Sequence, residues 1–124
     1  MASVMKCTVI STGVDAGYLS TWNAYVSMVK DAKSDQAAVV EWGQKGEHLI
    51  LAKATQPTER WLGGSDGATA VWGLGLNYDY LTYDKADGTI GIEGSDAKLY
   101  WDGKYVQWGK PNQNTISCKL VPVS

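Results

Sequence analysis

The sequence has no phenylalanine and, among its 124 residues, only one histidine, two cysteines and three prolines. A serine or cysteine nucleophile needs a histidine beside it, and the chain offers only His48 for that purpose. Zinc needs at least three nitrogen, sulfur or oxygen ligands, which one histidine and two distant cysteines do not supply. We therefore expect neither an enzyme nor a bound metal or cofactor.

The sequence also lacks a large excess of charge of one sign and a long apolar run. Eleven basic and 13 acidic residues give a formal net charge of −2, too small a field to gather a phosphate backbone. The longest apolar stretch, residues 68–76, is interrupted by Thr69, Gly73 and Gly75 and is far shorter than the roughly 20 residues that cross a bilayer. These features exclude nucleic acid and membrane as expected partners.

Residues 1–10 contain neither the basic segment nor the unbroken apolar segment of a secretory signal. The chain is therefore cytoplasmic, or its signal has already been removed, and we expect the cytoplasm. The length fits one domain, residues 1–124.

The two cysteines, Cys7 and Cys118, stand near opposite ends of the sequence. Free cysteine is among the most buried residue types, so two buried thiols are one interpretation. The other is a disulfide between the terminal strands, because a closed barrel would bring those strands side by side. Both interpretations stay open.

A four-part pattern occurs three times along the chain, in residues of about 6–46, 47–88 and 89–122. Its clearest markers are Ile10, Leu51 and Ile92, which follow one another at a spacing of 41 residues. Asp-Gly pairs at 66–67 and 102–103 stand between alternating apolar residues, as in tight hairpins. The pattern predicts an all-β domain of twelve short strands, six closing a barrel and three hairpins capping one end.

The expected strands fall into four classes. First strands are expected at 7–11, 48–52 and 89–93, and second strands at 17–19, 60–62 and 98–101. Third strands are expected at 24–26, 70–72 and 105–108, and fourth strands at 38–42, 80–83 and 115–120. Two alternatives compete with this assignment: a short helix within residues 21–33, and a sandwich of two sheets.

Paired carboxylates at Asp79 and Asp84, or Asp84 and Asp87, have the proximity that a glycosidase uses. Both pairs flank strands and turns, where aspartate is common for its turn chemistry, so we interpret them as solvated turn residues. The glycine-rich run 63–67 lacks the Gly-Lys-Ser/Thr ending of a phosphate loop and is interpreted as a flexible turn.

The threefold pattern over residues 6–122 resembles the β-trefoil superfamily. Residues 61–68 followed by 80–84 are similar to a repeat of ricin-B-type lectins, which implies an acidic residue gripping sugar hydroxyls and an aromatic ring stacking on the sugar. The structural Gln-x-Trp signature of those lectins is absent, because Val40, Leu81 and Ile116 stand where its tryptophan would be. Core packing accounts for most of the six tryptophans.

In size, mild acidity and divergent trefoil pattern the chain also resembles fungal protease inhibitors, the mycocypins and especially the cocaprins, which are defence proteins. This resemblance implies non-covalent inhibition of papain-like cysteine proteases, and of aspartic proteases as well, through exposed loops. It implies a cysteine-protease loop at residues 11–17, assisted by the connection at 30–36. The expected binding residues are Gly13, Val14, Asp15, Ala16, Gly17, Asp31 and Lys33.

Two loops are candidates for the aspartic protease, residues 108–114 and a loop of Thr55, Gln56, Pro57, Thr58 and Glu59. Lys45 could imitate a trypsin substrate, but the glycines on either side weaken the rigidity that such a loop needs. The inhibitor function is favoured over the lectin function, so the expected partners are target proteases and, alternatively, glycans.

Overall fold

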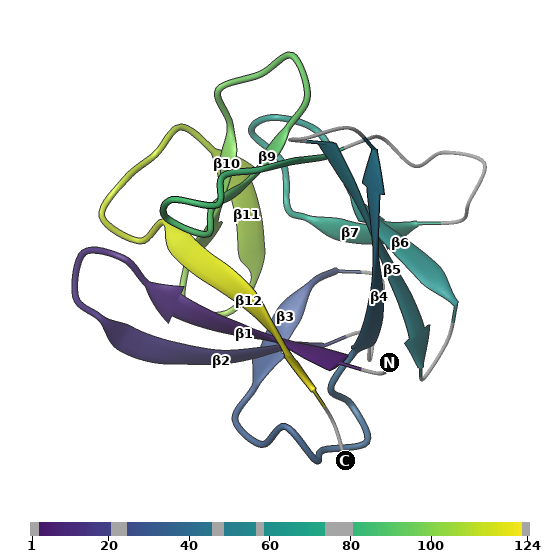
Figure 1. Cartoon of the computed structure of the whole chain (residues 1–124). Helices are drawn as coiled ribbons and strands as arrows, with labels where there is room; N and C mark the ends of the chain where they lie inside the picture. Colours follow the sequence, from purple (N-terminus) through teal and green to yellow (C-terminus); the bar gives the residue numbers. More distant parts are fainter. Residues whose placement is uncertain (1–2, 21–24, 46–48, 57–58, 74–80, 123–124) are drawn as a thin grey trace.

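The computed structural model describes residues 3–20, 25–45, 49–56, 59–73 and 81–122. Within these ranges it contains twelve strands and no helix, which confirms the all-β prediction (Figure 1). The strands in the first half of the chain are β1 (Ser3–Val9), β2 (Val14–Ser20), β3 (Ser27–Val29), β4 (Val39–Lys45), β5 (Leu49–Gln56) and β6 (Arg60–Gly63). Those in the second half are β7 (Val71–Gly73), β8 (Leu81–Tyr83), β9 (Ile90–Ile92), β10 (Lys98–Trp101), β11 (Val106–Gly109) and β12 (Ile116–Pro122).

Six strands form a strongly curled antiparallel sheet. Its ladders run in the order β12, β1, β4, β5, β8 and β9, and every neighbouring pair is antiparallel. The two ends of this row meet where the Cys118 N–H of β12 donates a 2.8 Å hydrogen bond to the Gly88 carbonyl, just before β9. This hydrogen bond joins the two ends of the row, which leaves few unpaired strand edges.

The other six strands pair as hairpins, β2 with β3, β6 with β7 and β10 with β11. Each hairpin attaches to the curled row through its first strand, to β1, β5 and β9 respectively. In Figure 1 the three hairpins occupy three separate sectors of the molecule. All twelve strands thus belong to one hydrogen-bonded sheet, unlike the two separate sheets of a sandwich.

Three backbone hydrogen bonds form a closed ring between the hairpins. The Val26 N–H donates to Ala70 O at 2.9 Å, the Ala70 N–H to Val106 O at 2.8 Å, and the Val106 N–H to Val26 O at 2.9 Å. All three side chains are buried. Each residue immediately precedes or begins the last strand of its hairpin, so the ring fixes the three hairpins against one another.

The segment that competed as a helix contains no helix where it is described. Residues 27–29 form β3, and residues 21–24 lie outside the described ranges. The Val26 backbone takes part in the ring and not in an i to i−4 helical bond, because its N–H is donated to Ala70.

The core lies between the curled row and the hairpins. Strands that face it alternate inward and outward, as in β11, where Val106 and Trp108 are buried and Gln107 is not. Four of the six tryptophans are in the core or packed against it: Trp42, Trp72, Trp101 and Trp108. The largest fully buried side chains are Trp108, Met5, Leu19, Leu62, Leu81, Ile90, Leu99 and Ile116.

Candidate functional site

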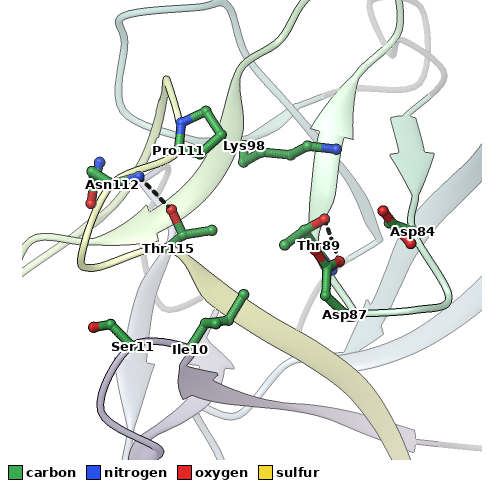
Figure 2. A pocket seen from close by; sticks show the side chains of 9 residues that line it. All are labelled: Ile10, Ser11, Asp84, Asp87, Thr89, Lys98, Pro111, Asn112 and Thr115. Carbon is green, nitrogen blue, oxygen red and sulfur yellow. Dashed lines mark hydrogen bonds between the residues drawn. The ribbon is translucent and has the colours of Figure 1, made fainter.

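A pocket of about 370 Å³ lies where three connections meet (Figure 2). The turn between β1 and β2, the β8–β9 connection and the β11–β12 connection each form part of its wall. The lining residues are Ile10, Ser11, Asp84, Asp87, Thr89, Lys98, Pro111, Asn112 and Thr115.

The three connections meet because the terminal strands pair. Val9 at the end of β1 lies opposite Ile116 at the start of β12, and the Ile10 N–H donates a 2.9 Å hydrogen bond to Thr115 O. The bond from Cys118 to Gly88 then brings the β8–β9 connection to the other side of β12. The pocket is therefore a product of the topology, assembled from segments far apart in sequence.

Two carboxylates stand on the β8–β9 wall, and each is fixed through one oxygen. Asp87 Oδ1 accepts hydrogen bonds from the Thr89 N–H at 2.9 Å and the Thr89 hydroxyl at 2.8 Å, and Asp84 Oδ1 accepts one from the Ala86 N–H at 2.9 Å. The second oxygen of each accepts no hydrogen bond from a residue that the structure describes. Partial burial raises the pKa of Asp87, but the hydrogen bonds from Thr89 and the charge of Lys98 outweigh it, and the net pKa is lowered.

The opposite wall is held by local hydrogen bonds of the β11–β12 connection. The Asn112 N–H donates to Thr115 Oγ1 at 2.8 Å, and Asn112 Oδ1 accepts from the Asn114 N–H at 2.7 Å. Pro111 and Ile10 add apolar surface, and 44% of Ile10 is exposed. The pocket thus combines fixed acceptors, one ammonium group and two apolar faces, a composition suited to a small polar ligand.

The predicted cysteine-protease loop begins at this pocket. Ser11 donates its hydroxyl to Gln113 O, and the Gly13 N–H donates to Val9 O at 2.8 Å. Val14 is 60% exposed. Asp15 Oδ1 accepts from the Gly17 N–H at 2.9 Å, and Asp15 Oδ2 lies 3.6 Å from Lys6 Nζ.

The two glycines of this loop differ in their surroundings. Gly13 has φ of 69°, and a Cβ built on it would meet nothing within 4 Å. A Cβ on Gly17, by contrast, would come within 2.7 Å of Val29 O. Gly17 and Ala16 are buried in β2, where Gly17 lies against β3 and Ala16 belongs to the core, while Gly13, Val14 and Asp15 are exposed.

The predicted assisting residues lie elsewhere. Asp31 and Lys33 are exposed on the β3–β4 connection, where Asp31 Oδ1 accepts from the Lys33 N–H at 2.9 Å. Figure 1 shows this connection on a different side of the molecule from the β1–β2 turn. The structure therefore does not bring them next to Gly13 and Val14.

The predicted second loop is described only in part. Thr55 donates its hydroxyl to Val39 O at 3.3 Å, and Gln56 ends β5. Glu59 pairs with Lys53 at 3.6 Å. Pro57 and Thr58 lie outside the described residues. The alternative loop, residues 108–114, supplies Pro111 and Asn112 to the pocket.

The residues of the lectin resemblance are dispersed. Lys53 Nζ lies 5.2 Å from the centroid of the half-buried Trp61 ring, and Asp66 accepts a 3.5 Å bond from Ser95. Leu81 is fully buried, and Tyr80 lies outside the described residues. Among the described residues of this set, Asp84 is the one that lines the pocket.

Sequence patterns alone did not point to Ile10, Thr89, Lys98 or Thr115 as site residues. The only signal for them was the expected closure of the barrel, which places the end of the first strand beside the start of the last. Within the described ranges no cluster of three or more histidine, cysteine or acidic residues is arranged to hold a metal, and no helix is long and apolar enough to span a membrane. His48 lies outside those ranges.

Comparison with known proteins identifies no relative whose function could be compared with this pocket. No family model, no curated protein and no solved structure matches this chain.

Proposed function

We propose that this chain is a β-trefoil protein that inhibits papain-like cysteine proteases, and aspartic proteases as well, by inserting exposed loops without covalent chemistry. The trefoil assignment is supported by the repeated pairing scheme, in which each group of four strands gives two members to the curled row and two to a hairpin. It is further supported by the closed ring of Val26, Ala70 and Val106, which relates the three hairpins to one another.

One observation supports the inhibitory role most directly: the β1–β2 turn displays Val14, 60% exposed, and Ile10, 44% exposed, on a backbone that is fixed. Hydrogen bonds tie it to Gln113, Thr115 and Val9. A turn whose conformation is already set loses little entropy when it enters a groove. Exposed aliphatic side chains on such a turn can fill apolar subsites of a protease.

The test is a titration of the purified chain into papain and pepsin assays, each at its working pH. Val14→Asp places a charge where an apolar contact is expected, so inhibition of papain should weaken by roughly tenfold or more. The matched control is Glu93→Ala on the equivalent exposed turn after β9, which should inhibit like the native chain.

Two glycines in similar surroundings provide a second matched pair of variants for this experiment. Gly13 and Gly94 both have positive φ, 69° and 82°, and a Cβ on either meets nothing within 4 Å. Alanine at the two positions should therefore cost similar stability, while only Gly13→Ala disturbs the proposed binding turn. Equal inhibition by Gly13→Ala, Val14→Asp and native protein would exclude this turn, and no inhibition of either enzyme would exclude the function.

A second function, carbohydrate binding, is supported by the pocket. The second oxygens of Asp84 and Asp87, which accept no hydrogen bond from a described residue, can accept hydrogen bonds from sugar hydroxyls, and Ile10 and Pro111 offer apolar faces. A glycan array tests it: a sugar bound by the native chain and lost with Asp87→Asn would establish this site. Binding that survives Asp87→Asn would place the sugar elsewhere.

A further inference from the structure

Cys7 and Cys118 face each other across the two terminal strands. They lie directly opposite in the β1–β12 register, and their Sγ atoms are 3.5 Å apart. Both are free thiols, 0% and 1% exposed. The Cys7 thiol is also 3.8 Å from Met5 O, so the pair sits in the core with a weak hydrogen bond between the two sulfurs.

The directions of the Cys118 N–H and carbonyl identify the type of antiparallel pair that Cys7 and Cys118 form. Its N–H donates to Gly88 O at 2.8 Å, and its carbonyl accepts a 3.3 Å bond from the Tyr83 hydroxyl. Both groups therefore point away from β1, which makes Cys7 and Cys118 a non-hydrogen-bonded antiparallel pair. Such pairs have Cα atoms about 4.5 Å apart, inside the range of roughly 4.4–6.8 Å that a disulfide spans.

We propose that Cys7 and Cys118 form a latent intramolecular disulfide that closes when the chain meets a small disulfide oxidant. In the first step the thiolate of one cysteine attacks a sulfur of oxidised glutathione, giving a mixed disulfide and one glutathione thiolate. The other cysteine, as a thiolate, then attacks the protein sulfur of the mixed disulfide and releases the second glutathione. Two protons and two electrons leave the cysteine pair, and the glutathione disulfide is reduced.

Burial controls the rate of this closure. Burial raises the pKa of Cys7, and the neighbouring Cys118 raises it further, so little Cys7 thiolate exists in the folded chain. The oxidant reaches the sulfurs only when β12 separates from β1. Among the described strands β12 forms a ladder with β1 alone, so this opening breaks a single ladder. Oxidation should accordingly accelerate in mild denaturant.

The experiment incubates the full chain with oxidised glutathione, natively and near its urea midpoint, and then returns it to native buffer. Intact mass after thiol blocking should show the loss of two hydrogens and no blocked thiol, and a non-reducing peptide map should link Cys7 to Cys118. Tying two positions this far apart should raise the thermal midpoint by on the order of 10 °C, reversed by dithiothreitol.

Cys7→Ala and Cys118→Ala are the matched controls, since neither can close the bridge, and neither should gain thermal stability from oxidant. If either variant does not fold, the mass and peptide map of the oxidised native chain still test the proposal. Two thiols still free at equilibrium, glutathione retained on both cysteines, or only intermolecular dimers would each overturn the proposal.

Discussion

The Trp108 indole occupies the space that a side chain on Gly64 would need. A Cβ on Gly64 would lie 2.6 Å from Trp108 Nε1, and the same Nε1 donates a 3.0 Å hydrogen bond to Gly63 O. Trp108 is 1% exposed, so its indole is surrounded by other core atoms. The glycine pair 63–64 thus packs against a core tryptophan that belongs to a different hairpin.

Gly64→Ala should therefore destabilise the fold well beyond the usual effect of a glycine substitution. Both the contact with Trp108 and the positive φ of 139° oppose a side chain, so we expect a loss of roughly 3 kcal/mol in urea unfolding. Gly67→Ala, in the same loop with φ of 83° and open space around it, should cost only about 1 kcal/mol. Equal losses would mean that the indole adjusts.

A related prediction concerns the indole hydrogen bonds. Trp72 donates from Nε1 to Ser20 O at 2.8 Å, as Trp108 does to Gly63 O. Trp72→Phe removes this donor and leaves part of the space filled by the buried indole empty, so unfolding free energy should fall by about 2 to 3 kcal/mol. Trp101→Phe is the control: Trp101 is half-buried, its indole donates to no described residue, and the loss should be at most about 1 kcal/mol.

Acid should weaken the fold through Asp102. Partial burial raises its pKa, but hydrogen bonds from the Tyr105 and Lys104 N–H groups and the Gln107 amide outweigh this, and the net pKa is lowered. The stabilisation is present above the unfolded pKa of about 4 and is lost as pH falls through the lower folded value.

Urea midpoints between about pH 5 and pH 2.5 measure this loss. Asp102→Asn keeps an acceptor for the two N–H groups but cannot be protonated in this range, so its midpoint should fall less steeply with acid than the native one. Asp35→Asn, at an exposed residue, provides the control slope. Parallel slopes for all three proteins would contradict the prediction.

The order and number of strands followed from the sequence, but their limits did not. Third strands were expected at 24–26, 70–72 and 105–108, and the structure begins β3, β7 and β11 later, at Ser27, Val71 and Val106. For β3 and β7 the cause is the ring: Val26 and Ala70, just before these strands, donate their N–H groups to other hairpins, and no local pattern reports such bonds. The first strand likewise begins at Ser3 because β12 pairs with it along its whole length.

The site was less predictable than the fold. The turn at Gly13 and Val14 could be singled out because glycine marks a turn in the sequence, and residues 108–114 were singled out as a loop. That these two loops and Asp87 share one pocket depends on the register of β1 with β12, and Gly17 proved to be a packing residue through its contact with Val29. Neither the shared pocket nor the Gly17 contact can be predicted from a pattern within one segment of the sequence.

The ring of Val26, Ala70 and Val106 also has a consequence for how the chain folds. Each of its bonds joins residues tens of positions apart, so the loop entropy of nearly the whole chain must be overcome before the ring closes. Any two of the three groups of strands can form only one of the three bonds. The molecule should therefore acquire its final structure in one slow cooperative step, and two thirds of it should not behave as a smaller version of the whole.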